Sequence, residues 1–381
     1  MILTDMASSL LRQKLANQEN KSSLWQALHI DVPLFIALCL LMMYGLFILY
    51  SASSQNLIVV EQQIMRIGFA FLVMFAFAQI PPRTYQRWAP WIYCIGVILL
   101  LAVLMVGHIN KGAQRWLNLG FFRFQPSEMM KLAIPLFLAC HFHKVHLPLM
   151  ARSLLFAAIV ILIPTVLTAR QPDLSTAILL AAAGVSVLLL AGLSWRLMGI
   201  MAALAALCAP ILWLVMHTYQ KQRVLIFFNP ERDPLGNGYH IIQSKIAIGS
   251  GGLFGKGWLN GTQSHLHFLP ENSTDFIFAV AGEEFGFIGS TLLILLFMAI
   301  IGRGLYITAK AQDTFTRLLA GSLTLTFFFS FFINMGMVTG ILPVMGLPLP
   351  LVSYGGSSMV TLMTSFGILM SIQTHRKLLT M

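Results

Sequence analysis

In Leu269-Pro270-Glu271-Asn272-Ser273-Thr274-Asp275-Phe276-Ile277-Phe278-Ala279-Val280, a long polar segment of the chain gives way to an apolar one. The apolar run extends from residue 276 to residue 302, which is long enough for a helix that crosses a membrane. Asp275 is therefore predicted to lie at a membrane boundary, where an ionised side chain is a candidate functional group. A purely structural alternative is open: Ser273 or Thr274 caps the helix, and Asp275 in its first turn is stabilised by the helix dipole.

The composition places the chain among membrane proteins. Hydrophobic residues make up 57% of the sequence and charged residues 10%, and the mean hydropathy is +0.80, which is far outside the range of soluble domains. Ten apolar runs have lengths close to what a transmembrane helix needs, and they lie at 32–51, 64–80, 88–107, 126–143, 152–169, 176–194, 197–217, 276–302, 314–336 and 353–374. The predicted fold is an all-α polytopic membrane protein with about ten transmembrane helices.

The charges predict the domain organisation and the orientation. Residues 1–31 form a polar tail without the apolar core and small-residue cleavage site of a secretory signal, residues 32–375 form one membrane-embedded domain, and residues 376–381 form a short second tail. Lysine and arginine are more frequent in the segments on the side of the N-terminus than in the short loops on the other side, so both termini are predicted to be cytoplasmic. The few basic residues of the short outer loops are Lys111, Arg115, Arg123 and Arg170.

The long connection at about 218–275 is then predicted to lie outside the cell. Connections of this length in a compact domain either have a function or are disordered. This one contains apolar residues that are predicted to dock on the helix bundle, namely Ile226, Phe227, Phe228, Ile241, Ile242, Ile246 and Ile248. Its glycine-rich stretch at 249–257 does not have the spacing of a phosphate-binding loop, so the glycines are predicted to permit tight turns near the membrane surface.

Arg115 and Arg223 are predicted to lie on the same membrane face as Asp275, together with Lys111, Arg123 and Arg170. Arginine binds phosphate groups through two parallel hydrogen bonds, and a lipid diphosphate is the anion most available at that depth. The alternative is an interfacial belt of basic side chains that reach towards lipid headgroups. Arg115 is the residue most favoured to bind the diphosphate, because it lies beside Trp116 in a polar loop.

Further ionisable residues lie inside or next to the predicted spans. Glu128 and Lys131 are three residues apart, which places them on one helix face, either as a structural ion pair or as part of a functional site. Asp173 follows a proline between two spans, and the same two interpretations apply to it. On an ideal helix that starts at Asp275, Glu283 is rotated about 80° from Asp275, so it is predicted to face the same cavity.

The last span is preceded by a run that breaks regular helix, Gly346-Leu347-Pro348-Leu349-Pro350-Leu351-Val352-Ser353-Tyr354-Gly355-Gly356-Ser357-Ser358. Irregular backbone at membrane depth occurs only inside the protein or beside a water-filled cavity. The hydroxyl groups of Ser353 and Tyr354 are therefore predicted to support the site.

Five motifs in this order are similar to those of the SEDS family of shape, elongation, division and sporulation proteins. They are Gln125-Pro126-Ser127-Glu128, Asp233-Pro234-Leu235-Gly236-Asn237-Gly238-Tyr239, Gln243-Ser244-Lys245-Ile246-Ala247-Ile248-Gly249, Thr274-Asp275-Phe276-Ile277-Phe278-Ala279 and Ser353-Tyr354-Gly355-Gly356. The resemblance extends from about residue 32 to residue 375 and favours the elongation branch over the division branch, because Leu347-Pro348-Leu349-Pro350 has a proline where division members usually have threonine. Ser273 departs from the family, which commonly has histidine at that position.

The resemblance implies a SEDS-type bundle with one long extracytoplasmic loop and a glycosyltransferase that polymerises lipid II into β-1,4 glycan at the outer face of the bacterial cytoplasmic membrane. It implies that Asp275 is essential, either as the base for the acceptor hydroxyl or as the ligand of a divalent cation such as Mg²⁺. The residues expected to bind the diphosphate are Arg115, Arg223, Lys245 and Gln243, and those expected to support the site are Glu128, Lys131, Asp173, Ser353 and Tyr354.

The resemblance further implies a class B penicillin-binding protein as the cross-linking partner, along with other proteins of the elongation complex. No nucleic-acid partner is predicted, because the net charge of +11 follows the pattern of topology signals and lipid contacts. Two alternative functions remain open at this point: a transporter that flips the lipid-linked precursor, and a scaffold without catalytic activity.

Overall fold

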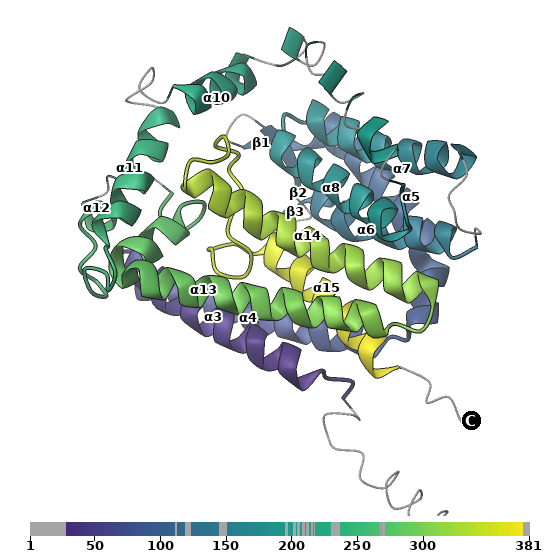
Figure 1. The fold of residues 1–381 in the computed structure, drawn as a ribbon, viewed down its shortest axis with the longest axis horizontal. Coiled ribbons are helices and arrows are strands. Elements are labelled where there is room, and N and C mark those ends of the chain that lie inside the picture. The colour runs from purple at the N-terminus through teal and green to yellow at the C-terminus, as the bar shows by residue number, and fades with distance from the viewer. Residues whose placement is uncertain are drawn as a thin grey trace, which may run out of the picture.

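The computed structural model describes residues 28–110, 113–118, 123–144, 151–194, 197–200, 218–229, 237–266, 268 and 271–375, with isolated residues between 203 and 216. This part of the chain is almost entirely helical (Figure 1). Its helices are α3 (Val32–Ala52), α4 (Leu57–Ala78), α5 (Pro82–Val106), α6 (Pro126–Phe142), α7 (Ala151–Arg170), α8 (Leu174–Leu190), α10 (Thr218–Phe228), α11 (Asn237–Ser250), α12 (Thr262–His265), α13 (Ile277–Lys310), α14 (Thr314–Val338) and α15 (Ser357–Thr374).

Nine of the ten predicted spans coincide with helices of the described chain. The predicted span at 197–217 is described at 197–200, where it is helical, and beyond that only at isolated residues. Six of the described helices are long and apolar enough to cross a membrane. The second span begins at residue 57 rather than at 64, because the Asn56 side chain accepts a hydrogen bond from the backbone N–H of Ile58 at 3.0 Å and so starts the helix earlier.

A small antiparallel sheet lies between α5 and α6, where the sequence predicted only a polar loop. It consists of β1 (His108–Asn110), β2 (Ala113–Asn118) and β3 (Arg123–Phe124) in the order β1-β2-β3. Strands this short carry no clear alternation of apolar and polar residues, so their pattern is hard to detect in sequence. The pairing fixes β2 at the end of the bundle and thereby fixes the position of Arg115.

Helix α14 lies in the middle of the bundle and packs against α6, α8 and α13, whereas α15 packs chiefly against α4 (Figure 1). Most of α14 is buried, but α4 leaves Met65, Phe69 and Leu72 more than half exposed. An apolar helix face that no protein covers is expected to contact lipid. The predicted docking of the long connection is correct for Ile226 and Ile241, which are buried, but wrong for Phe228 and Ile246, which are exposed.

Helix α13 is interrupted in its third turn, at Gly286, whose φ of 63° and ψ of −157° are not helical. The carbonyl groups of Glu283 and Glu284 accept hydrogen bonds from the backbone N–H groups of Lys256 and Gly257, both at 3.0 Å. These donors belong to the segment 251–257, called here the glycine loop. The loop therefore supplies partners for carbonyl groups that a broken helix would leave unpaired inside the membrane domain.

The same loop also pairs the donors on the other side of the break. The N–H of Phe287 donates to the carbonyl of Gly252 at 2.9 Å, and the N–H of Ile288 donates to that of Leu253 at 3.2 Å. With partners on both sides of the break, the backbone hydrogen-bond ladder of α13 continues through the loop. The first turns of α13, which follow Asp275, are held in place by this contact.

The glycines of this loop have two separate roles. The prediction of tight turns is confirmed, because Gly252, Gly255 and Gly257 have positive φ angles. A second role was not predicted: a Cβ atom at Gly251 would lie 2.0 Å from the carbonyl oxygen of Gly282, and one at Gly255 would lie 2.0 Å from that of Glu284. Only glycine permits the two backbones to approach closely enough for the hydrogen bonds described above.

The first and last described segments meet at one end of the bundle. The imidazole rings of His29 and His375 stack with their centroids 4.0 Å apart, and Nδ1 of His29 lies 3.1 Å from the hydroxyl of Thr374. Asp31 lies nearby in the sequence and forms a two-point ion pair with Arg303, at 2.7 and 3.0 Å. The entry into α3 and the end of α15 are thus held together by side chains.

We expect the stability of the protein to decrease as the pH falls below about 6.5, the ordinary histidine pKa. Burial, and then the proximity of His375, lower the pKa of His29 in the folded protein. The unfolded chain therefore takes up a proton that the folded chain does not, so stability is lost on acidification and the loss levels off once the pH is below the folded pKa as well. Thermal unfolding in detergent between pH 8 and pH 5 measures this effect.

The variant His29→Gln should show a smaller decrease over this pH range than the wild type. His143→Gln is the matched control, because His143 is exposed and lies in a turn after α6. An identical pH dependence in wild type and His29→Gln would show that the stacked pair does not respond to protonation.

Candidate active site

Asp275 lies in the turn that precedes α13, outside the helix itself. The N-cap residue of α13 is Phe276, without a side-chain capping hydrogen bond, and the helix begins at Ile277. The hydroxyl of Thr274 points back to Glu271, to which it donates at 2.9 Å. The capping alternative is therefore wrong for Ser273 and Thr274, and the half-buried Asp275 is not a residue of the first helical turn.

Asn334 fixes the backbone of Asp275. Its fully buried side chain lies on α14 and donates from Nδ2 to the carbonyl oxygens of Asp275, at 2.9 Å, and of Leu347, at 2.6 Å. One amide group thus joins the turn with Asp275 to the irregular segment before α15. Sequence analysis missed Asn334, although an asparagine in the middle of an apolar span is a detectable signal.

The segment 340–356 before α15 is non-helical and borders Asp275, so the predicted irregular run at 346–358 is confirmed up to residue 356, and helix α15 already begins at Ser357. A Cβ atom at Gly346 would lie 3.4 Å from Oδ2 of Asp275, so this glycine is next to the carboxylate. Farther along the segment, Ser353 donates from its hydroxyl to the carbonyl of Thr274 at 2.5 Å, and the N–H of Tyr354 donates to the carbonyl of Ser273 at 2.9 Å. Ser353 and Tyr354 thus contact the turn that contains Asp275, and their supporting role stays a prediction.

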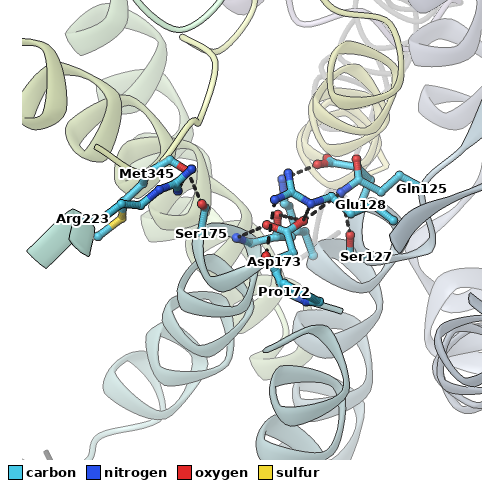
Figure 2. Close-up of polar contacts among 11 residues, drawn as sticks. Gln125, Ser127, Glu128, Pro172, Asp173, Ser175, Arg223 and Met345 are labelled. Atoms are coloured by element: carbon cyan, nitrogen blue, oxygen red, sulfur yellow. Dashed lines mark hydrogen bonds and ion pairs between the residues drawn. The ribbon is translucent and has the colours of Figure 1, made fainter. Parts of the chain in front are cut away.

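Arg115 and Arg223 line one cavity of about 180 Å³, called here the arginine pocket. Its wall includes Gln220 and Ser175 and the end of the segment that leads to Gly346. Arg223 donates from Nη1 to the carbonyl of Met345 at 3.4 Å, and the Ser175 hydroxyl donates to the same oxygen (Figure 2). Met345 lines the arginine pocket, and the next residue, Gly346, borders the Asp275 carboxylate.

Asp173 positions Arg115. Its nearly fully buried carboxylate lies 3.3 Å from Nε of Arg115, and it caps α8 by accepting from the N–H of Thr176 at 3.2 Å and from its hydroxyl at 2.9 Å. Gln125 also donates to this carboxylate, at 3.3 Å (Figure 2). These partners hold the Asp173 carboxylate in place, and Arg115 is held at the N-terminal end of α8 with part of its side chain exposed.

Glu128 and Lys131 form the predicted ion pair in the first turns of α6. The distance between Oε1 and Nζ is 2.7 Å, and the two side chains are 8% and 11% exposed. Both line a small cavity of about 40 Å³ beneath the segment 347–353, together with Ser353. The pair thus lies across a small cavity from the irregular segment, and its charges neutralise each other.

Several predicted residues lie elsewhere. Lys245 is exposed on α11, with its Nζ atom 2.6 Å from where a Cβ of Gly340 would be, and Gln243 lies half-buried on the same helix. Neither is among the residues that line the arginine pocket. Lys111, residues 233–236, His267 and the side chain of Arg123 are outside the described part of the chain.

The prediction that Glu283 faces the same cavity as Asp275 is wrong. Its carboxylate accepts from Lys256 Nζ at 2.7 Å, from the hydroxyl of Thr262 at 3.0 Å and from the N–H of Gln263 at 2.9 Å. The angular estimate failed because Asp275 is not part of the helix, so counting 100° per residue from it has no meaning. Glu283 instead holds the glycine loop and α12 against α13.

The sequence matches a family model described as a cell cycle protein, which groups FtsW, RodA and SpoVE, over residues 30–378. It is 53% identical over 366 residues to the peptidoglycan glycosyltransferase MrdB of Escherichia coli strain K12, and this match covers 96% of the present chain and 99% of MrdB.

Two solved structures are similar to the described fold. One belongs to a peptidoglycan synthase complex described as coordinating polymerization and crosslinking, with a TM-score of 0.79, 31% identity and coverage of 90% of this chain and 97% of that one. The other is the rod shape determining protein RodA of Thermus thermophilus, with a TM-score of 0.69, 26% identity and coverage of 91% and 98%. The similarity in sequence and in structure thus extends over nearly the whole chain.

Proposed function

The chain belongs to the SEDS family, which includes FtsW, RodA and SpoVE, and from this premise we propose that it polymerises lipid II into β-1,4 glycan strands during cell elongation. It is a multi-pass membrane protein and a peptidoglycan glycosyltransferase. The observation that supports the proposal is that Met345 lines the arginine pocket while the Asp275 carboxylate lies next to Gly346, the following residue.

The reaction joins the 4-hydroxyl of one sugar to the anomeric carbon of another, which is α-linked to a lipid diphosphate. In a single displacement the new C–O bond forms as the bond to the diphosphate breaks, so the configuration inverts from α to β. The proton of the hydroxyl needs an acceptor, and in our proposal the half-buried carboxylate of Asp275 takes it as general base. Asn334 keeps that carboxylate in place through the backbone.

The leaving diphosphate gains negative charge as its bond to the sugar breaks. Fixed cations near this charge lower the energy of the transition state, and they do so more strongly in a site from which water is partly excluded. Arg115 and Arg223 are the two cations of the arginine pocket, and both have their guanidinium groups anchored, on Asp173 and on the Met345 carbonyl respectively. We assign the diphosphate of the donor substrate to this pocket. Lys245 and Gln243 are not assigned to it.

A divalent cation such as Mg²⁺ is compatible with the acid at this site. Among the described residues no three metal-ligating side chains cluster together, so Asp275 would be the protein ligand, and substrate phosphates and water would complete the shell, as is usual for Mg²⁺. Bound there, the ion would stabilise negative charge on the diphosphate. A chelator in the polymerisation assay distinguishes this role of Asp275 from that of a base.

We place the protein in the bacterial inner membrane with both termini in the cytoplasm and Asp275 at the outer face. The excess of basic residues on the side of the termini supports this orientation. A class B penicillin-binding protein is the partner that we propose for crosslinking, since a similar chain occurs in a complex that couples polymerization to crosslinking.

The test is polymerisation of lipid II by the purified protein, with and without the partner, with the products separated on a gel. Glycan polymer is the expected product of the protein. Movement of lipid II across the bilayer of proteoliposomes without polymer would support a transporter instead, and the absence of both activities would support a scaffold.

Arg115→Ala is expected to lower kcat in this assay by about tenfold or more, because it removes a charge-assisted contact to the leaving group. The best control is Arg83→Ala, since Arg83 is exposed at the start of α5. Arg303 would be a poor control, because its ion pair with Asp31 joins α13 to the start of α3. Equal rates for the Arg115 and Arg83 variants would contradict the assignment of the diphosphate.

A further inference from the structure

Gln63 is the only buried polar residue of α4. It lies in the second turn of the helix, about 9 Å along the axis from Leu57, and it is 1% exposed, whereas Glu61 and Gln62 are exposed and Arg66 is half-buried. An amide that is buried in a membrane-spanning helix costs free energy unless it is hydrogen-bonded, so its presence is expected to have a specific cause.

The Gln63 amide makes few hydrogen bonds. Its Nε2 atom donates to the carbonyl oxygen of Ser353 at 3.3 Å, which is long for such a bond. Its Oε1 atom is buried and has no partner within the described part of the chain. One long hydrogen bond and one unpaired acceptor contribute little to the stability of a fold, and departures of this kind are concentrated at functional sites. The contact with Ser353 therefore points to a role in function rather than in stability.

Ser353 is bonded to the turn that contains Asp275. Its hydroxyl donates to the carbonyl of Thr274 at 2.5 Å, and the N–H of Tyr354 donates to the carbonyl of Ser273 at 2.9 Å. The two peptide groups that precede Asp275 are thus held by two consecutive residues of the irregular segment. Through the carbonyl of Ser353, helix α4 is bonded to the same two residues.

Close packing alone does not fix the irregular segment near Ser353. On one side α3 packs tightly against it, because a Cβ atom at Gly45 would lie 3.1 Å from the Cα atom of Val352. Elsewhere the segment borders the cavity of about 40 Å³ that Glu128 and Lys131 also line, which leaves it room to shift. Its position therefore depends on hydrogen bonds, and networks of such bonds make a local structure rigid.

Asp275 needs a fixed position to act as proposed above. A general base reacts when it lies about 2.6–3.2 Å from the atom whose proton it takes, and a misplacement of about 1 Å lowers a rate by about 100-fold. The carbonyl of Asp275 is bonded to Asn334. The peptide groups before Asp275 depend on Ser353 and Tyr354, and Ser353 in turn is bonded to Gln63.

We propose that Gln63 is a positioning residue for Asp275 and that it acts through Ser353. The proposal rests on the function proposed above, since Gln63 itself takes no part in the chemistry. Gln63 is not among the residues that line the arginine pocket. Its loss is therefore expected to affect the rate of the chemical step, measured as kcat, and not the binding of the lipid diphosphate, measured through KM.

Gln63→Met is the variant that tests this role. Methionine is unbranched and similar in length to glutamine, so it fills the same space without the hydrogen bond. The substitution removes one unpaired acceptor, Oε1 of Gln63, and leaves another, the carbonyl of Ser353, so the unfolding midpoint is expected to stay close to that of the wild type. Gln373→Met is the matched control, because the Oε1 atom of Gln373 is also buried without a partner in the described chain, but at the opposite end of α15 from Ser353.

In the polymerisation assay, Gln63→Met should lower kcat about tenfold and change KM by less than about twofold. Gln373→Met should have the kcat and KM of the wild type. A merely structural role of Gln63 would lower the unfolding midpoint and leave the kcat of the folded protein unchanged. If the wild type polymerises lipid II and Gln63→Met does so with unchanged kcat, the positioning role is wrong and the proposed function stands.

A double-mutant cycle shows whether the effect passes through Ser353. Ser353→Ala removes the hydrogen bond to Thr274 and should lower kcat by itself. If Gln63 acts through Ser353, adding Gln63→Met to this variant should lower kcat further by less than about threefold. Combined with Arg115→Ala, which changes the arginine pocket, the same substitution should still lower kcat about tenfold. Equal effects in both backgrounds would contradict the coupling through Ser353.

Backbone hydrogen exchange measures the same coupling without reference to activity. The N–H of Tyr354, which is bonded to the carbonyl of Ser273, should exchange about tenfold faster in Gln63→Met than in the wild type or in Gln373→Met, because the segment opens locally more often. Unchanged exchange would overturn the proposal. Faster exchange with wild-type kcat would also overturn it, because the contact would then order the segment without affecting Asp275. If the wild type makes no polymer, the proposed function fails and the positioning role fails with it.

Discussion

Asp275→Ala is expected to lower the rate of glycan polymerisation by about 10²–10⁴-fold, the range typical for loss of a general base. The carboxylate lies next to Gly346, the residue that follows Met345 of the arginine pocket, and the backbone of Asp275 is held by Asn334. Removing the side chain leaves those backbone contacts in place, because Asn334 binds the carbonyl of Asp275 and not its carboxylate. Polymer yield from lipid II, measured against the unfolding midpoint of the same preparation, is the test.

Asp275→Asn separates charge from shape, since it keeps the size of the side chain and removes its ability to accept the proton. It should be almost as inactive as Asp275→Ala. Glu271→Gln is the matched control: it neutralises another carboxylate of the same turn, whose side chain is exposed and bonded to Thr274. Polymerisation at the wild-type rate by Asp275→Asn would show that this carboxylate is neither the base nor a metal ligand.

Among glycine-to-alanine substitutions near the site, Gly255→Ala is expected to lower the free energy of unfolding the most. The new Cβ would lie 2.0 Å from the carbonyl oxygen of Glu284 and 2.4 Å from its carbon, and both are backbone atoms that cannot move aside. The φ of +81° adds strain of about 1–2 kcal/mol for a residue with a side chain. Forcing the glycine loop away from α13 would also remove hydrogen bonds to buried carbonyl groups, at about 1–3 kcal/mol for each.

We therefore expect a loss of more than about 3 kcal/mol, seen as a strong decrease of the unfolding midpoint and of the folded yield. Two neighbouring glycines provide graded controls. Gly252 has a φ of +57° but open space around a Cβ, so its alanine variant should show only the strain, and Gly249 has open space without a positive φ, so its variant should be close to neutral. If the variants of Gly255 and Gly252 are equally stable, the close approach of the loop to the broken helix does not limit stability.

Sequence analysis predicted the membrane class, nine of the helices in the described chain and the position of Asp275 between polar and apolar segments. These features follow from local composition, because a membrane span needs a continuous apolar run whatever its neighbours are. The ion pair of Glu128 and Lys131 was also predictable, since residues three apart on a helix face the same side. The irregular backbone before α15 was also predictable, from its prolines and glycines.

Features that depend on contacts between distant segments were missed or predicted wrongly. The role of Glu283 depends on the position at which α13 begins and on the loop that packs against it, and neither is encoded within a few residues of Glu283. The amide of Asn334 joins residues 275 and 347, which are far from it along the chain. The separation of Lys245 and Gln243 from the arginine pocket likewise results from where α11 packs.

The sequence by itself thus determined that this chain crosses a membrane many times and carries an acid at the boundary of one span. The reason is that the free energy of placing a segment in the lipid bilayer depends mainly on the residues of that segment. Only the tertiary structure decided which cations gather beside the irregular segment that borders that acid. Arg115 and Arg223 come from elements more than a hundred residues apart, and they share one pocket because β2, α8 and α10 converge on the same irregular segment. The physical reason is that a site of this kind requires several weak contacts from distant segments to be satisfied at once, and only the packed bundle supplies them together.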